Sequence, residues 1–151
     1  MRLHVALVGF LALASLTACT AEPSTPPAVT VTYTCCVATD VETPYQPGQT
    51  MTVHWIVQTP EEPVSGPPQV ELTASLTGPY ASADDLKGGA AGAATYTAAP
   101  VRPSGAPDEQ PVSTIVIGAD AQPGLYNLVT SANQDGATSG GSSVVRVDPK
   151  S

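Results

Sequence analysis

Hydrophobic and polar side chains alternate with a period of two along much of this chain. In 50-TMTVHWIVQ-58 every second residue from Met51 to Val57 is apolar, and His54 lies on the opposite, polar side. The alternation is complete in 69-QVELTASLT-77. A period of two is typical of strands that bury one face. Both segments are therefore predicted to be half-buried β-strands, with Trp55 in the core.

Five more segments are predicted to be strands because they are short, contain β-branched residues and lie between Pro, Gly and Asp turns. Together with the first two they make seven short strands within about 120 residues, the size of one domain. This number and spacing predict an all-β fold with a β-sandwich. The five are Thr30–Ala38, Ala93–Ala98, Pro111–Gly118, Leu125–Ala132 and Ser142–Val147.

Two stretches resemble immunoglobulin-like domains. The first, 45-YQPGQTMTVHW-55, is similar to the Pro-Gly turn that leads into a core strand. The second, 120-DAQPGLYNLVTSA-132 followed by 142-SSVVRV-147, is similar to their last two strands. The resemblance implies a seven-stranded immunoglobulin-like β-sandwich over residues 29–149. It also implies that Tyr126 is a core tyrosine-corner residue, whose hydroxyl bonds to nearby backbone.

The N-terminus has the pattern of an export signal. Arg2 precedes an apolar run from Val5 to Leu16. That run is too short for a membrane-spanning helix, which needs about 20 apolar residues, but it has the length of a signal-peptide core. The domain is therefore predicted to be exported.

The residues after this run, Leu16-Thr17-Ala18-Cys19, resemble the lipobox of bacterial lipoproteins. The resemblance implies that residues 1–18 are a cleaved lipoprotein signal peptide and that Cys19 is lipidated. The alternative is ordinary secretory cleavage with Cys19 as a bystander. Residues 19–28 are rich in proline and are predicted to form a semi-rigid tether.

Charge narrows the range of partners. The chain has 5 Lys and Arg against 13 Asp and Glu, and removal of Arg2 would leave 4 − 13 = −9. Without a basic patch, binding to nucleic acid or to anionic lipid headgroups is disfavoured. The richness in Ala, Pro, Thr and Gly resembles lipoproteins of high-GC Gram-positive bacteria. We therefore expect a lipid anchor on the outer, extracytoplasmic face of the bacterial cytoplasmic membrane.

The sequence contains few groups suited to catalysis. His54 is the only histidine that would remain after signal removal, and no G-x-S-x-G elbow is present. Its place on the polar side of a strand predicts a solvated side chain. The carboxylate pairs Glu61-Glu62 and Asp84-Asp85 lie in turn-like stretches. No catalytic residues and no cofactor are predicted.

The adjacent cysteines Cys35 and Cys36 leave two interpretations open. An exported domain favours a vicinal disulfide, although adjacent Cα atoms lie only about 3.8 Å apart. Alternatively, Cys35 is a small core residue and Cys36 an exposed thiol that pairs between molecules. Cys35, Cys36, Met51 and His54 include soft metal ligands. If the first two strands pair antiparallel, Cys36 could lie roughly opposite Met51. Alternation, however, points Cys35 and Met51 inward and Cys36 and His54 outward, so only two potential ligands fall on each face. No metal site is therefore predicted.

These observations favour a non-enzymatic binding or structural module. The membrane, through the lipid on Cys19, and a cell-envelope protein or glycan are the expected partners, with no nucleic acid. Two alternatives remain: a metal- or redox-active module that uses Cys35 and Cys36, and an accessory subunit of a cell-envelope hydrolase.

Overall fold

A computed structural model describes residues 31–61, 69–106 and 108–151. The predicted signal peptide, the lipidation site Cys19 and the tether over 19–28 lie outside the described residues. Among the described residues, no helix has the length and apolar character needed to cross a membrane.

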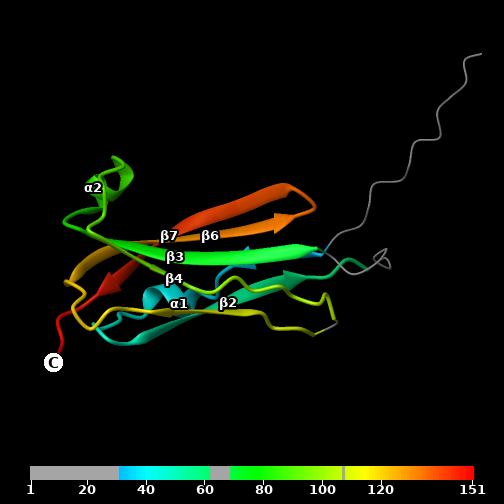
Figure 1. Cartoon of the computed structure of the whole chain (residues 1–151), viewed down its shortest axis with the longest axis horizontal. Coiled ribbons are helices and arrows are strands. Elements are labelled where there is room, and N and C mark those ends of the chain that lie inside the picture. Colours follow the sequence, from blue (N-terminus) through cyan, green and yellow to red (C-terminus); the bar gives the residue numbers. More distant parts are fainter. Residues whose placement is uncertain (1–30, 62–68, 107) are drawn as a thin grey trace, which may run out of the picture.

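The chain folds into two antiparallel sheets (Figure 1), which is consistent with the predicted β-sandwich. The seven predicted strands are present. One sheet has the order β1-β2-β5 and the other the order β4-β3-β6-β7. Their bounds are β1 Thr32–Cys35, β2 Thr50–Gln58, β3 Val70–Tyr80, β4 Ala94–Thr97, β5 Val112–Val116, β6 Gly124–Gln134 and β7 Ala137–Val147, with the helices α1 Ala38–Glu42 and α2 Ala83–Lys87.

The core lies between the two sheets and follows the alternation in the sequence. Along all 11 residues of β3, buried side chains alternate with half-buried ones. On β2, Met51, Val53 and Trp55 are buried, whereas His54 faces outward. Removing one apolar face of each sheet from water is the main source of stability for such a fold.

The first strand is shorter than predicted. The alternating segment Thr30–Ala38 predicts one strand, but β1 ends at Cys35 and helix α1 follows. Cys35 pairs with Trp55, and Met51 pairs instead with Ile115 of β5. The expected position of Cys36 opposite Met51 is therefore wrong, because β1 accompanies only the second half of β2.

The last hairpin is longer than predicted. β7 begins at Ala137 rather than Ser142, and it pairs with β6 without interruption as far as Val147. The two-residue turn has positive φ angles at Asp135 (50°) and Gly136 (85°). This Asp-Gly combination is the preferred type I′ turn, which matches the twist of the flanking strands.

The two ends of the sandwich carry different parts of the chain. Thr32 at the start of β1 lies near the β6–β7 turn, since both border one hollow. Tyr80, Gly124 and Val147 meet at the opposite end. Strands of 11 residues at about 3.3 Å per residue separate these ends by roughly 30 Å. The first strand therefore begins at the end of the sandwich opposite the end of β7.

Candidate functional site

Beyond the end of β1, helix α1 lies beside β2 and provides a hydrogen-bond partner for its edge. The Trp55 N–H bonds to Pro111 O on the β5 side, so the neighbouring His54 directs its N–H toward the β1 side. β1 has already ended at Cys35, opposite Trp55. The Asp40 carboxylate accepts the His54 N–H instead, at 2.7 Å. A side chain on α1 thus satisfies a backbone donor that would otherwise lack a partner.

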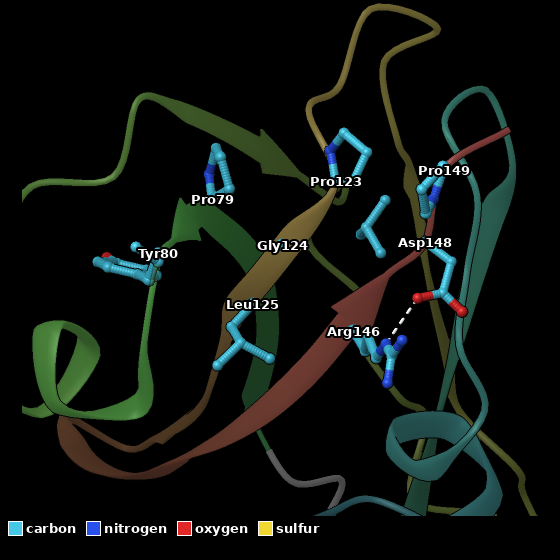
Figure 2. A pocket seen from close by; sticks show the side chains of 10 residues that line it. Pro79, Tyr80, Pro123, Gly124, Leu125, Arg146, Asp148 and Pro149 are labelled. Carbon is cyan, nitrogen blue, oxygen red and sulfur yellow. Dashed lines mark hydrogen bonds and ion pairs between the residues drawn. The ribbon is translucent and has the colours of Figure 1, made fainter.

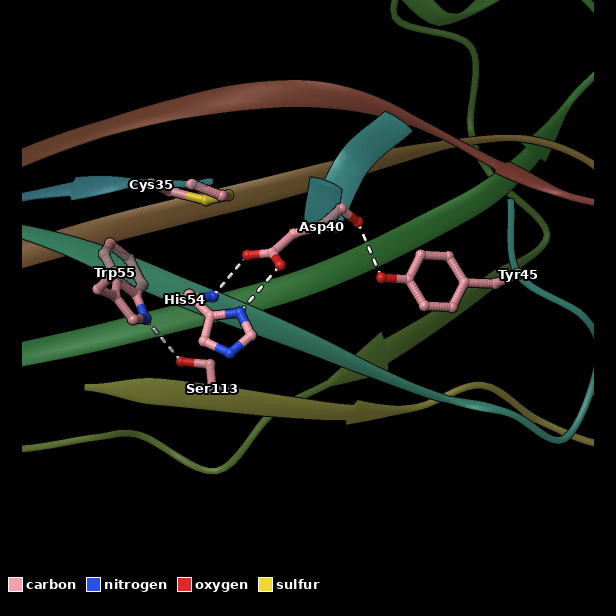
Figure 3. The surroundings of a disulfide bond; sticks show 7 residues. Cys35, Asp40, Tyr45, His54, Trp55 and Ser113 are labelled. Atoms are coloured by element: carbon pink, nitrogen blue, oxygen red, sulfur yellow. Dashed lines mark hydrogen bonds and ion pairs between the residues drawn. A yellow bond between two sulfur atoms is a disulfide. The ribbon is translucent and has the colours of Figure 1, made fainter. Parts of the chain in front are cut away.

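The same carboxylate holds the His54 ring. His54 Nδ1 lies 2.9 Å from Asp40 Oδ1, and Figure 3 marks this contact with a dashed line. Asp40 is only 6% exposed and His54 48% exposed. The Tyr45 hydroxyl donates to Asp40 O at 2.9 Å. Burial, reinforced by the Asp40 carboxylate, raises the Tyr45 pKa above its usual value, so this donor stays protonated at neutral pH.

A carboxylate at Nδ1 orients an imidazole as a base or metal ligand at Nε2. Across the described ranges, however, no serine or cysteine side chain hydrogen-bonds to His54. Nor do three or more His, Cys, Asp or Glu side chains gather there at metal-binding distance. Through its two contacts with His54, the Asp40 carboxylate joins α1 to β2.

A disulfide joins Cys35 and Cys36 at the point where β1 passes into α1. Both cysteines are half-buried and pack against the core cluster that contains Met51 and Tyr126. Cys36 is therefore not the exposed thiol of the alternative interpretation, because the chain turns here instead of continuing as a regular strand. Figure 3 places Cys35 on the same side of β2 as Asp40.

Trp55 and Tyr126, the two predicted core aromatics, are both buried. Trp55 Nε1–H donates to Ser113 Oγ at 3.0 Å (Figure 3). The Tyr126 hydroxyl donates to Gln122 O at 2.8 Å, which is a tyrosine-corner contact. Its ring packs so closely that a Cβ added to Gly78 would lie 2.6 Å from it. Burial, with smaller effects from Tyr96 and Asp120, raises the Tyr126 pKa.

An open pocket of about 620 Å³ lies at the end of the sandwich where β3 and β7 finish and β6 begins (Figure 2). Pro79, Pro123 and Pro149 contribute rigid apolar walls. Arg146 is 69% exposed and donates from Nε to Asp148 Oδ1 at 2.6 Å. The pocket therefore combines apolar surface with the Arg146–Asp148 ion pair at its rim.

Sequence reasoning missed both Asp40 and this pocket. Asp40 lies 14 residues from His54 on a five-residue helix, so no periodic pattern links them. The Pro123-Gly124 turn could have indicated the pocket, because it starts the strand that resembles immunoglobulin-like domains. The pair Asp84-Asp85 lies in the first turn of α2, where the Ser82 hydroxyl accepts the Asp85 N–H as an N-cap.

Comparisons with known proteins give little beyond this geometry. No protein-family model matches the chain, and no curated protein matches it. Among solved structures, one match is the sporulation control protein Spo0M from Bacillus subtilis, at 13% identity and a TM-score of 0.37. The match covers 80% of this chain and 49% of Spo0M, so the chain spans about half of that protein.

Proposed function

We propose that this protein is a bacterial lipoprotein whose single domain works as a non-enzymatic binding module on the outer face of the cytoplasmic membrane. The observation that carries this proposal is the lipobox-like sequence Leu16-Thr17-Ala18-Cys19 directly after a complete export signal. Two or three acyl chains on Cys19 would anchor the protein stably, whereas one chain binds only marginally.

The strand order supports an immunoglobulin-like sandwich in particular. If β1, β2 and β5 correspond to strands A, B and E, then β3, β6 and β7 correspond to C, F and G, with β4 beside β3. Strands C, F and G form one sheet in immunoglobulin domains. The Tyr126–Gln122 hydrogen bond at the start of β6 agrees with this assignment.

The position of the pocket in Figure 2 supports a binding role. It lies at the end of the sandwich opposite the start of β1, roughly 30 Å away. A domain tethered through Cys19 would hold this end away from the bilayer. A cell-envelope protein or glycan could then reach Arg146 and the proline walls.

Lipidation is tested by expressing the full chain and Cys19→Ser in an actinobacterial host with a clickable fatty acid. We expect label and partition into the detergent phase for the wild type, and loss of both for Cys19→Ser. The double variant Cys35→Ser/Cys36→Ser is the matched control and should keep both. Equal labelling of wild type and Cys19→Ser would refute the lipoprotein assignment.

The binding role is tested by crosslinking on intact cells. Arg146→Glu reverses the exposed cation at the pocket, and Arg102→Glu reverses an exposed cation that pairs with Glu71 elsewhere. We expect one recurrent envelope partner for the wild type, several-fold less of it with Arg146→Glu, and no change with Arg102→Glu. Equal recovery with both variants would exclude this pocket as the binding surface.

A further inference from the structure

A trough runs along one side of the sandwich between the edge strands of the two sheets. Two hollows of about 200 Å³ each make it up, and both are bordered by Tyr33, Ala132 and Ser139. Thr32–Cys35 of β1 forms one wall, and Ala137–Ser143 of β7 forms the other. Because the hollows share three lining residues, they form one continuous feature, here called the trough.

The β7 wall offers backbone hydrogen-bonding groups. At its far end, Arg146 O accepts the Tyr45 N–H at 2.9 Å and the Asp148 N–H donates to Tyr45 O at 2.8 Å. Since the pairing of β7 with β6 is uninterrupted, other even-numbered residues direct their N–H and C=O the same way. Among the residues that the structure covers, no strand pairs with this edge at Thr138, Gly140 or Ser142.

Helix α1 packs against β7, but the sequence of the edge that borders the trough has no charge, proline or bulge to block strand addition. From Ala137 to Val145 it has no charged residue and no proline, and its register with β6 shows no bulge. Natural sheets usually protect long edges with lysine, proline or bulges. The same edge already accepts Tyr45 of this chain in a parallel bridge with Val147.

One tyrosine beside the trough has a buried hydroxyl without a hydrogen-bond partner in the part of the chain that the structure describes. Tyr33 is 4% exposed and borders both hollows, and its hydroxyl has no hydrogen-bond partner among the described residues. Buried polar atoms of this kind are uncommon in native structures. Burial, with a further effect of the Glu109 carboxylate, raises the Tyr33 pKa.

We propose that the trough binds an extended peptide segment of a partner protein as an added strand on β7. Alternate side chains of the peptide would enter the two hollows, and backbone bonds to Thr138, Gly140 and Ser142 would supply affinity. Charge favours a neutral or basic peptide over a second copy, because each copy carries a formal charge of −8. The proposal is independent of the lipid anchor and of the pocket in Figure 2.

The test uses the full chain in detergent and a capped heptapeptide of sequence lysine–threonine–valine–threonine–valine–threonine–lysine. Trp55, the only tryptophan, lines the trough and reports binding through its fluorescence. We expect saturable binding. Methylation of alternate peptide nitrogens keeps charge and side chains but removes strand donors, and should weaken binding by about tenfold or more.

A matched pair of protein variants locates the contact. Ser142→Pro removes an N–H that points away from β6, whereas Ser142→Ala keeps it. We expect about tenfold weaker binding for the proline variant and no more than about twofold for alanine. Equal binding of methylated and unmethylated peptides, or no binding up to millimolar peptide, would overturn the proposal whether or not Ser142→Pro folds. Dimerisation of the peptide-free chain that Ser142→Pro abolishes would overturn the choice of a peptide as occupant.

Discussion

At the residue scale, the buried pair Trp55–Ser113 offers a direct measure of one hydrogen bond. Ser113→Ala leaves the Trp55 Nε1–H buried without its acceptor. We expect a loss of about 1–3 kcal/mol in the free energy of unfolding. Urea unfolding followed by Trp55 fluorescence measures it. Thr114→Ala, an exposed change on the same strand, should cost much less, and equal losses would show that the bond contributes nothing.

Asp40 provides the second residue-scale prediction. Asp40→Ala removes the acceptor of the His54 N–H and the partner of its ring. We expect a loss of about 1–3 kcal/mol, since a backbone donor loses its partner. Hydrogen exchange at the His54 amide should quicken as well. Thr39→Ala, exposed on the same helix, is the control, and unchanged His54 exchange in Asp40→Ala would contradict the capping role.

Single residues were predictable from the sequence where strand alternation determines their environment. Alternation alone places Trp55 inside and His54 outside, and the structure has them so. Asp40 was not predictable, because its partner is distant in sequence and its burial depends on where β1 ends. The half-buried position of Cys36 depends on the same chain turn at the end of β1.

At the element scale, the sequence predicts the seven strands but not their ends. β2 has the predicted bounds Thr50–Gln58, whereas β3 extends to Tyr80, beyond the alternating segment 69–77. The first half of β7, rich in serine and glycine, has low intrinsic strand propensity and is a strand because it pairs with β6. Helix α1 lacks a side-chain N-cap, so its start carries no capping signal in the sequence.

The loop before β5 should make the free energy of unfolding decrease at acid pH. The Glu109 carboxylate accepts N–H groups of Ser104 at 3.0 Å and Gly105 at 2.9 Å. These bonds, led by Ser104, hold the Glu109 pKa below its usual 4.5. A lowered folded-state pKa gives stability that is present above pH 4.5 and lost as pH falls through the folded pKa.

We therefore expect Glu109→Gln to reduce the difference in unfolding free energy between neutral and acid pH. Denaturant unfolding at a series of pH values measures this difference. Glu61→Gln, a change of the same chemistry at an exposed position, is the control. If both variants keep the full pH dependence of the wild type, the loop carboxylate does not contribute to it.

At the scale of the whole molecule, buried tyrosines should make the stability of the sandwich depend on alkaline pH. Burial is the main cause that raises the pKa of Tyr33, Tyr45, Tyr96 and Tyr126 above 10.0. Tyr33 packs in the core cluster that contains Trp55. Tyr126 belongs to the other core cluster, and Tyr45 and Tyr96 pack against it. We therefore expect these four tyrosines to ionise together with the unfolding of the whole sandwich.

A raised folded-state pKa gives stability that is complete below the unfolded pKa of 10.0 and is lost as pH rises through the folded pKa. We expect tyrosinate absorbance to appear above pH 10.0, together with loss of near-ultraviolet circular dichroism, because ionisation and unfolding are coupled. Tyr126→Phe removes one such group and its bond to Gln122. It should lower stability at neutral pH by about 1 kcal/mol and make the alkaline decline less steep. Tyrosinate that forms at pH 10.0 with the fold intact would mean that these hydroxyls are open to water, and that the two sheets pack less closely around them than the structure requires.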